Sequence, residues 1–223
     1  MKISGAIFDC DGTLVNSLGF WDVFYSKLGE HYFGDPGFRV DPVDDRAMRT
    51  QNVYFLSKLM HEKYGVDESP EALLDWVNAL FAWYYKEVVE LKPGVREFLA
   101  FLKSQNVKMC IASAAEIESI RLVLGRHGVL HYFEDIISCT KVGAGKDKPD
   151  VFLAAERFLN TPHEETWVFE DSVLAIETAK KAGFPVAGVY DANGFGQERA
   201  QLLSDVFVPE DGSFSDLIPL FDK

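Results

Sequence analysis

Short apolar runs recur along the chain, and several of them stop at a turn that carries polar residues. The first run spans residues 3–8 and ends in the acidic, glycine-containing turn 9–13. Runs of this kind predict buried β-strands. We expect strands at residues 3–8, 107–112, 135–138, 166–169, 185–189 and 205–208. Apolar residues at helical spacing predict helices from Pro93-Gly94 to 102 and over 116–126, 149–159 and 173–182. This alternation is typical of a parallel sheet covered by helices on both faces.

Residues 17–90 interrupt the alternation, because their apolar stripes all have helical spacing. One stripe begins at Phe20 and another at Val53, and a third follows the helix-start signature Ser69-Pro70. A helical block between the first and second strands predicts a second, smaller domain inserted into the core. We therefore predict an α/β fold with a Rossmann-like core at residues 1–16 and 91–223 and an inserted α-helical domain at 17–90.

Composition narrows the classes of partner. The chain has 223 residues, 48% of them hydrophobic, and a net charge of −13. No basic stripe is visible, so we expect neither nucleic-acid binding nor attachment to an anionic membrane surface. The N-terminus lacks the pattern of a signal peptide, and the three cysteines lack metal-ligand spacing, so we expect a cytoplasmic protein and, by default, a monomer. The same charge argues at first against any anionic substrate.

The ends of the expected strands carry the chemically active residues. Asp9 and Asp11 follow the first strand, and Ser113 ends the second. Lys146 lies in the loop after the third strand, and Glu170-Asp171 follows the fourth. Because the carboxyl ends of parallel strands meet at one edge of a sheet, we expect these side chains to converge there.

Four converging carboxylates would repel one another and raise one another's pKa values. A hard cation relieves this repulsion, and Mg²⁺ prefers carboxylates together with water and phosphate oxygens. Ser113 and a following helix start supply donors for a phosphate, and Lys146 supplies a compact positive charge. A carboxylate nucleophile, a second carboxyl and groups that hold an anion are what phosphoryl transfer to an aspartate requires.

Four ordered motifs then carry a resemblance that covers essentially the whole chain. The chain resembles hydrolases of the haloacid dehalogenase (HAD) superfamily, in the branch similar to β-phosphoglucomutase and phosphoglycolate phosphatase. The matching segments are 9–15, 111–113, 146–150 and 168–172, with residues 92–95 similar to the return from the cap domain to the core. The resemblance implies that residues 17–90 form a helical cap. Asn16 stands where many members have aspartate.

The resemblance also implies residue roles. Asp9 would attack phosphorus and become an aspartyl-phosphate, and Asp11 would protonate the leaving oxygen and then activate water. Ser113 and Lys146 would hold the phosphoryl group, together with backbone N–H groups of Gly12 and Ala114. The implied Mg²⁺ ligands are Asp9, the backbone carbonyl of Asp11, Glu170 and Asp171. The implied substrate is a small phosphorylated metabolite.

The superfamily includes several reactions. Dehalogenation needs neither Mg²⁺ nor a second aspartate, so the acid set argues against it. A sugar phosphate mutase must hold a second phosphate, and Glu116 is an acid where that family pattern has a basic residue. Arg46 and Arg49 in the cap could still hold one, or could be exposed helix charges. We therefore expect a Mg²⁺-dependent phosphatase acting on a small phosphomonoester, with the mutase and a non-catalytic binding relative as alternatives.

Overall fold

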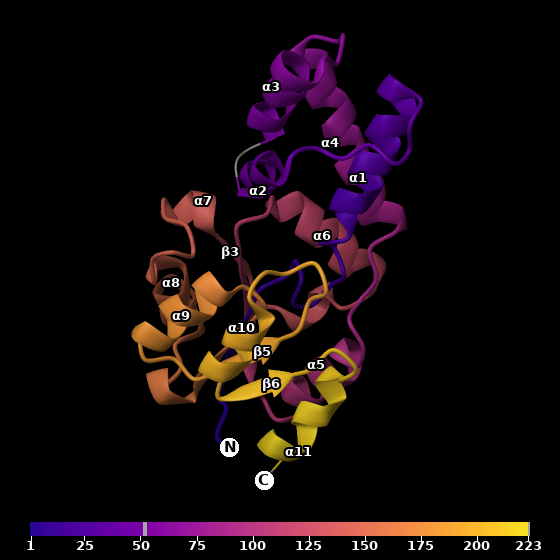
Figure 1. The fold of residues 1–223 in the computed structure, drawn as a ribbon. Coiled ribbons are helices and arrows are strands. Elements are labelled where there is room, and N and C mark those ends of the chain that lie inside the picture. The colour runs from indigo at the N-terminus through magenta and orange to yellow at the C-terminus, as the bar shows by residue number, and fades with distance from the viewer. Residues whose placement is uncertain (51–52, 223) are drawn as a thin grey trace. The chain divides into compact units, whose positions relative to one another are not determined.

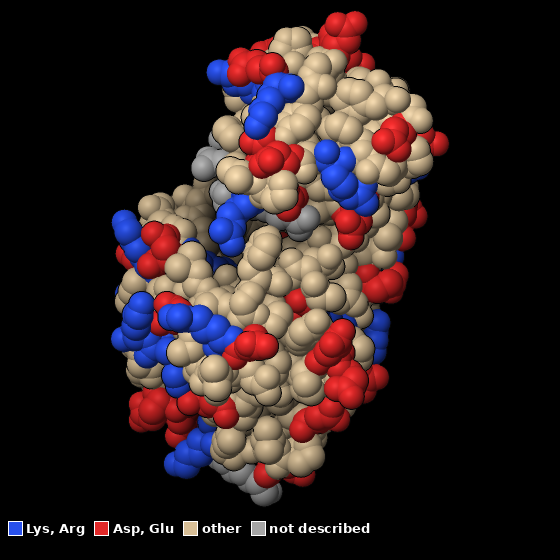
Figure 2. Space-filling model, viewed as in Figure 1, with Lys and Arg blue, Asp and Glu red and all other residues tan. Residues whose placement is uncertain are grey.

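The computed structural model describes residues 1–50 and 53–222, without the side chains of 49 and 50. The chain divides into two compact units, a core unit of Met1–Leu18 with Val89–Lys223 and a helical unit of Gly19–Val88. Figure 1 draws the helical unit in indigo and purple. Within the described residues, no helix combines the length and apolar character needed to cross a membrane. On the face drawn in Figure 2, described Lys and Arg side chains are interspersed with Asp and Glu.

The core unit is built on a six-stranded parallel sheet with the order β3-β2-β1-β4-β5-β6. This confirms the predicted α/β Rossmann-like fold. The strands are β1 (Gly5–Phe8), β2 (Lys108–Ser113), β3 (Ile136–Ser138), β4 (Thr166–Glu170), β5 (Val186–Val189) and β6 (Val206–Val208). Phe8 in the central strand pairs with Ile111 on one side and with Phe169 on the other. This register brings the carboxyl ends of β1, β2 and β4 to the same edge of the sheet.

Helices and short turns connect the strands of the core unit. They are α5 (Val95–Ser104), α6 (Ile117–Arg126), η2 (Leu130–Tyr132), α7 (Cys139–Val142), α8 (Asp150–Leu159), η3 (His163–Glu165), α9 (Val173–Lys181), α10 (Gln197–Leu203), η4 (Phe214–Leu217) and α11 (Ile218–Phe221). The helices predicted near 95, 117, 150 and 173 are present, whereas the sequence did not predict α7, α10 or α11. In α10 only Ala200 is buried and Leu202 is 85% exposed, so the helix has almost no apolar stripe to detect.

Both faces of the sheet are packed. On one face Ile7 and Val168 belong to a buried cluster with side chains of α8 and α9. On the other face Phe8 stacks on Phe169 with ring centroids 4.3 Å apart, and Phe98 of α5 meets both rings at their edges. Successive residues of β1 therefore face two different layers of core, which is why the strand is apolar without alternation.

The helical unit contains α1 (Phe20–Leu28), the π-helical turn η1 (Gly29–Phe33), α2 (Pro42–Thr50), α3 (Val53–Tyr64) and α4 (Pro70–Glu87). The predicted start of α4 is confirmed, since the Ser69 hydroxyl accepts a hydrogen bond from the Ala72 N–H at 3.2 Å. Aromatic packing joins α1 to α4, with Phe20 stacked on Phe81 at 3.7 Å between ring centroids. The aromatic stripe of α1 is therefore mainly core, with Phe20 and Phe24 buried.

Candidate active site

The turn that follows β1, residues 9–15, presents the first site residues. The Asp9 N–H continues the ladder by donating to the Phe169 carbonyl at 2.9 Å, and the Leu14 and Val15 N–H groups both donate to the Cys10 carbonyl. Gly12 has φ +85°, a left-handed conformation that favours glycine. A Cβ atom there would lie 2.6 Å from Asp171 Oδ2. The turn thus needs glycine for its own bend and for its close approach to the β4 end.

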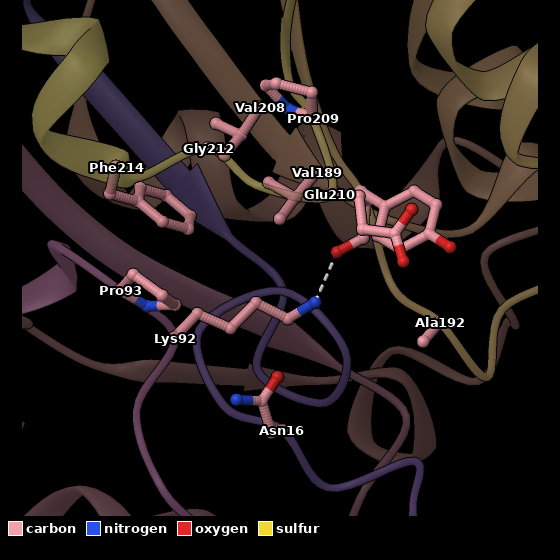
Figure 3. A pocket seen from close by; sticks show the side chains of 11 residues that line it. Asn16, Lys92, Pro93, Val189, Ala192, Val208, Pro209, Glu210, Gly212 and Phe214 are labelled. Carbon is pink, nitrogen blue, oxygen red and sulfur yellow. Dashed lines mark hydrogen bonds between the residues drawn. The ribbon is translucent and has the colours of Figure 1, made fainter.

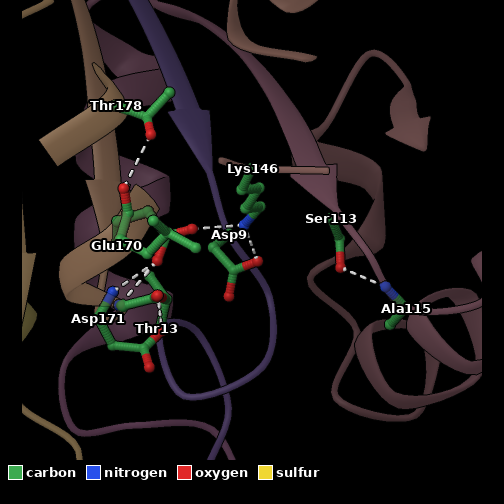
Figure 4. A network of polar contacts seen from close by, with 10 residues as sticks. Asp9, Thr13, Ser113, Ala115, Lys146, Glu170, Asp171 and Thr178 are labelled. Carbon is green, nitrogen blue, oxygen red and sulfur yellow. Dashed lines mark hydrogen bonds and ion pairs between the residues drawn. The ribbon is translucent and has the colours of Figure 1, made fainter. Parts of the chain in front are cut away.

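Lys146 reaches into this edge from the loop between α7 and α8. Its ammonium group donates to Asp9 Oδ1 and to Glu170 Oε1, as Figure 4 shows. The side chains are 12%, 9% and 1% exposed respectively. Burial alone would lower the pKa of Lys146, but the charges of Asp9 and Glu170 outweigh burial and raise it. Lys146 is therefore charged, and it partly neutralises two buried carboxylates.

Asp9, Glu170 and Asp171 form a compact acidic cluster whose ligand oxygens lie within 4.8 Å of one another. Burial raises the pKa of Asp9 to about 6, with the charge of Lys146 opposing and that of Glu170 adding to the shift. Burial also raises the pKa of Asp171, followed by repulsion from Glu170 and Asp9. One ammonium group therefore does not fully compensate the cluster. An oxygen-rich, buried and under-neutralised donor set fits a hard divalent cation such as Mg²⁺.

Hydrogen bonds from the chain orient the two acids at the end of β4. Glu170 Oε2 accepts the N–H groups of Asp171 and Ser172, both at 2.9 Å. Since Glu170 Oε1 accepts from Lys146, both oxygens of this carboxylate have partners within the protein. Asp171 Oδ1 accepts the Thr13 hydroxyl at 2.8 Å. Thr13 is fully buried and was not among the predicted site residues, although its position in the turn after Asp11 was a signal.

Ser113 closes β2 beside this cluster, and Figure 4 shows it on the strand next to that of Asp9. It is 2% exposed, and its hydroxyl oxygen accepts the Ala115 N–H at 3.0 Å. Ala114, the next residue, is exposed. Asp11 lies partly buried in the turn after β1, and its backbone forms an isolated parallel β-bridge with Val15. These residues share the edge of the sheet with the acidic cluster.

The structure thus brings Asp9, Lys146, Glu170 and Asp171 into direct contact or close range in the core unit. The two arginines that could hold a second phosphate belong to the helical unit. Arg46 is exposed on α2. The side chain of Arg49 lies outside the part of the chain that the structure describes. Their suggested role in substrate binding remains a prediction.

Comparison with known proteins identifies phosphatases and a mutase among the relatives of the chain. Over 181 residues, the chain is 30% identical to the phosphorylated carbohydrates phosphatase of Thermotoga maritima, covering 81% of this chain and 82% of that one. It is 28% identical to hexitol phosphatase B of Escherichia coli K12, covering 81% of each chain. It is also 30% identical to the β-phosphoglucomutase of Bacillus subtilis, but over only 53% of this chain and 49% of that one.

Solved structures show the same fold. A Thermotoga maritima structure assigned as a β-phosphoglucomutase superposes with a TM-score of 0.80 at 24% identity, covering 98% of both chains. CbbY of Rhodobacter sphaeroides, solved with phosphate, gives 0.73 at 21% identity and covers 96% of both. Residues 3–183 match the family described as haloacid dehalogenase-like hydrolase. With this match across most of its length, the chain belongs to the haloacid dehalogenase-like hydrolases.

Proposed function

We propose that this protein is a Mg²⁺-dependent phosphatase that hydrolyses a small phosphomonoester through an aspartyl-phosphate on Asp9. The observation that carries the proposal is the contact of Lys146 with both Asp9 and Glu170 at the carboxyl edge of the sheet, with Asp171 beside them. Such a site combines a buried carboxylate nucleophile with a cation that can bind phosphoryl oxygens. The phosphatase relatives support the same activity.

In the first step, an Asp9 carboxylate oxygen would attack phosphorus while the bond from phosphorus to the ester oxygen breaks. Asp11 would transfer its proton to the leaving alcohol, so that no free alkoxide forms. Lys146 and the Ser113 hydroxyl would hold the non-bridging oxygens. The Ser113 hydroxyl oxygen accepts from Ala115, which leaves its own proton available for a phosphoryl oxygen.

In the second step, Asp11 would take a proton from water as the water oxygen attacks phosphorus. The bond from phosphorus to Asp9 breaks, and inorganic phosphate and the free carboxylate are formed. Bound Mg²⁺ would supply charge neutralisation for the carboxylates and the phosphoryl oxygens. Asp9, Glu170 and Asp171 are the side chains that would hold it, because each offers one carboxylate oxygen to the same small volume, and the backbone carbonyl of Asp11 would be a further ligand.

The substrate we propose is a phosphorylated sugar or a similar small metabolite. The relatives named for phosphorylated carbohydrates, hexitol phosphates and fructose 1-phosphate support this class. A screen of sugar phosphates, nucleotides and phosphoglycolate, with released phosphate as the readout, tests the class and ranks its members.

The mechanism is tested with Asp9→Asn and with chelation of divalent cations. We expect hydrolysis of a generic phosphomonoester to require Mg²⁺ and to be lost in Asp9→Asn. Activity that survives Asp9→Asn would show that Asp9 is not the nucleophile. The mutase would be favoured instead if the protein isomerised a hexose phosphate in the presence of a bisphosphate activator and released no net phosphate.

A further inference from the structure

Outside the acidic cluster, the core unit buries a second Lys–Asp pair. Lys92 and Asp191 are only 8% and 4% exposed, and their charged atoms lie 2.9 Å apart. The Lys92 ammonium group also donates to the Tyr190 carbonyl. Figure 3 shows the Lys92 side chain among the residues that line a cavity next to this pair. Burying a charge is costly unless it is paired and hydrogen-bonded, so each of these residues depends on the other.

Lys92 is directly joined to the turn 9–15 through the backbone. Its N–H donates to the Leu14 carbonyl at 2.9 Å, and Leu91 forms an antiparallel bridge with Val15. Asn16 N–H donates to the Glu90 carbonyl at 2.9 Å. Residues 90–92 therefore run as a short partner strand along the outgoing end of the turn that begins with Asp9.

Asp191 is in turn fixed by its own loop, which follows β5. Its Oδ1 accepts the Asn193 N–H at 2.8 Å, and its own N–H donates to Gln197 Oε1 at 3.3 Å. The Tyr190 N–H extends the sheet by donating to the Val208 carbonyl. The pair thus connects the 90–92 segment, and through it the turn 9–15, to the rigid end of β5.

The Lys92 side chain lies apart from the acidic cluster, so it is not placed to hold a phosphoryl group there. It lines a separate cavity of about 330 Å³ together with Asn16, Tyr190 and Glu210, and the cavity walls include none of the acidic cluster. Its ammonium group contacts Asp191 and Tyr190, whereas Lys146 contacts Asp9 and Glu170. Lys92 can therefore influence the chemistry only through the backbone that it holds.

We propose that Lys92 and Asp191 are positioning residues, which hold the turn 9–15 in the geometry that catalysis by Asp9 and Asp11 requires. The expected effect of the pair on kcat rests on the proposed function. The expected effect of the pair on the structure of the turn 9–15 does not. A displacement of about 1 Å in a catalytic group can lower the rate by roughly 100-fold. Loss of the pair should therefore reduce kcat much more than it changes KM.

The experiment compares Lys92→Met with the double variant Lys92→Met/Asp191→Asn. The single variant leaves a buried carboxylate without its cation, so it should lower both the unfolding temperature and kcat. The double variant removes both charges, so it should recover most of the unfolding temperature while kcat stays roughly 10- to 100-fold below the parent. Recovery of kcat together with stability would overturn the proposal, because it would assign the pair a purely structural role.

Hydrogen exchange of the peptide covering 9–16 provides a readout that does not depend on activity. We expect faster exchange there in both variants and unchanged exchange in Lys180→Met, which removes a more exposed Lys–Asp pair elsewhere in the core unit. Unchanged exchange of 9–16 in Lys92→Met would overturn the proposal. If the parent protein hydrolyses no phosphomonoester, the proposed function fails, and the exchange experiment alone decides whether the pair holds the turn.

Discussion

Replacing Lys146 by methionine tests how much the Lys146 charge stabilises the buried carboxyl groups in the metal-free protein. The substitution removes the ammonium group that contacts both Asp9 and Glu170. Removing one partner of a buried ion pair costs about 3–5 kcal/mol when the remaining charge persists. Here the charge need not persist, because the pKa of Asp9 is already raised to about 6, mainly by burial.

The magnitude follows from the cost of protonating Asp9. At pH 7, adding a proton to a group with a pKa near 6 costs about 1.4 kcal/mol. Lys146 lowers the pKa of Asp9, so its removal makes protonation still easier. Protonation of Asp9 therefore limits the Asp9 part of the loss in unfolding free energy of Lys146→Met to about 1.4 kcal/mol at pH 7, and the lost contact with Glu170 adds a further loss. At pH 5.5 the loss should be smaller, because Asp9 is then mostly protonated.

Urea unfolding in the presence of a chelator measures the free energy of unfolding of Lys146→Met and of the parent at pH 7 and at pH 5.5. Lys148→Met is the matched control, since Lys148 lies exposed in the same loop. Its unfolding free energy should stay close to that of the parent at both pH values. A loss of unfolding free energy in Lys146→Met that is the same at pH 7 and at pH 5.5 would refute the reasoning, because it would mean that Asp9 stays charged.

Four further outcomes follow from the same site. Mg²⁺ should bind more weakly as the pH falls through about 6, because the pKa values of Asp9 and Asp171 are raised and their protons must leave before the ion binds. Titration calorimetry at pH 5.5 and 7.5 measures the two affinities, and equal affinities would contradict this expectation. Thr13→Val should weaken Mg²⁺ binding roughly 10-fold, because the Thr13 hydroxyl lowers the pKa of Asp171. Thr178→Val, which loses only a bond to the Leu174 carbonyl, should leave that affinity unchanged. Gly12→Ala should lower the free energy of unfolding by about 1–3 kcal/mol in urea titrations, because of its positive φ and the proximity of Asp171. Asp9→Asn should reduce kcat by at least about 1,000-fold in a phosphate-release assay while retaining the fold by circular dichroism.

The sheet and the acidic cluster were predictable because each rests on a local pattern. Asp9 directly follows an apolar run and Glu170 ends one, and parallel strands bring such ends to one edge. The register of Phe8 with Phe169 then places the two carboxylates at the same level. Lys146 was predictable as a candidate by its place in the loop after β3, but its contact with both acids required the structure.

Contacts between side chains distant in sequence could not be predicted in this way. Thr13 and Asp171 are 158 positions apart, and no periodicity in either segment indicates that one donates to the other. Lys92 stands beside Pro93-Gly94, so in the sequence it is an unremarkable charge before a helix start. Only its burial against Asp191 distinguishes it from the exposed lysines of the same unit.

The net charge of −13 proved less informative than the placement of a few charges. An anion approaching the site meets the Lys146 ammonium group as well as carboxylates, and burial raises the pKa of Asp9 to about 6, so this carboxyl group takes up a proton more readily than an exposed one. A bound cation stabilises such a site, because it reduces the repulsion between carboxylates that burial has strengthened. The net negative charge of the chain is therefore compatible with the phosphate substrate that we propose, provided that a divalent cation is bound at the acidic cluster.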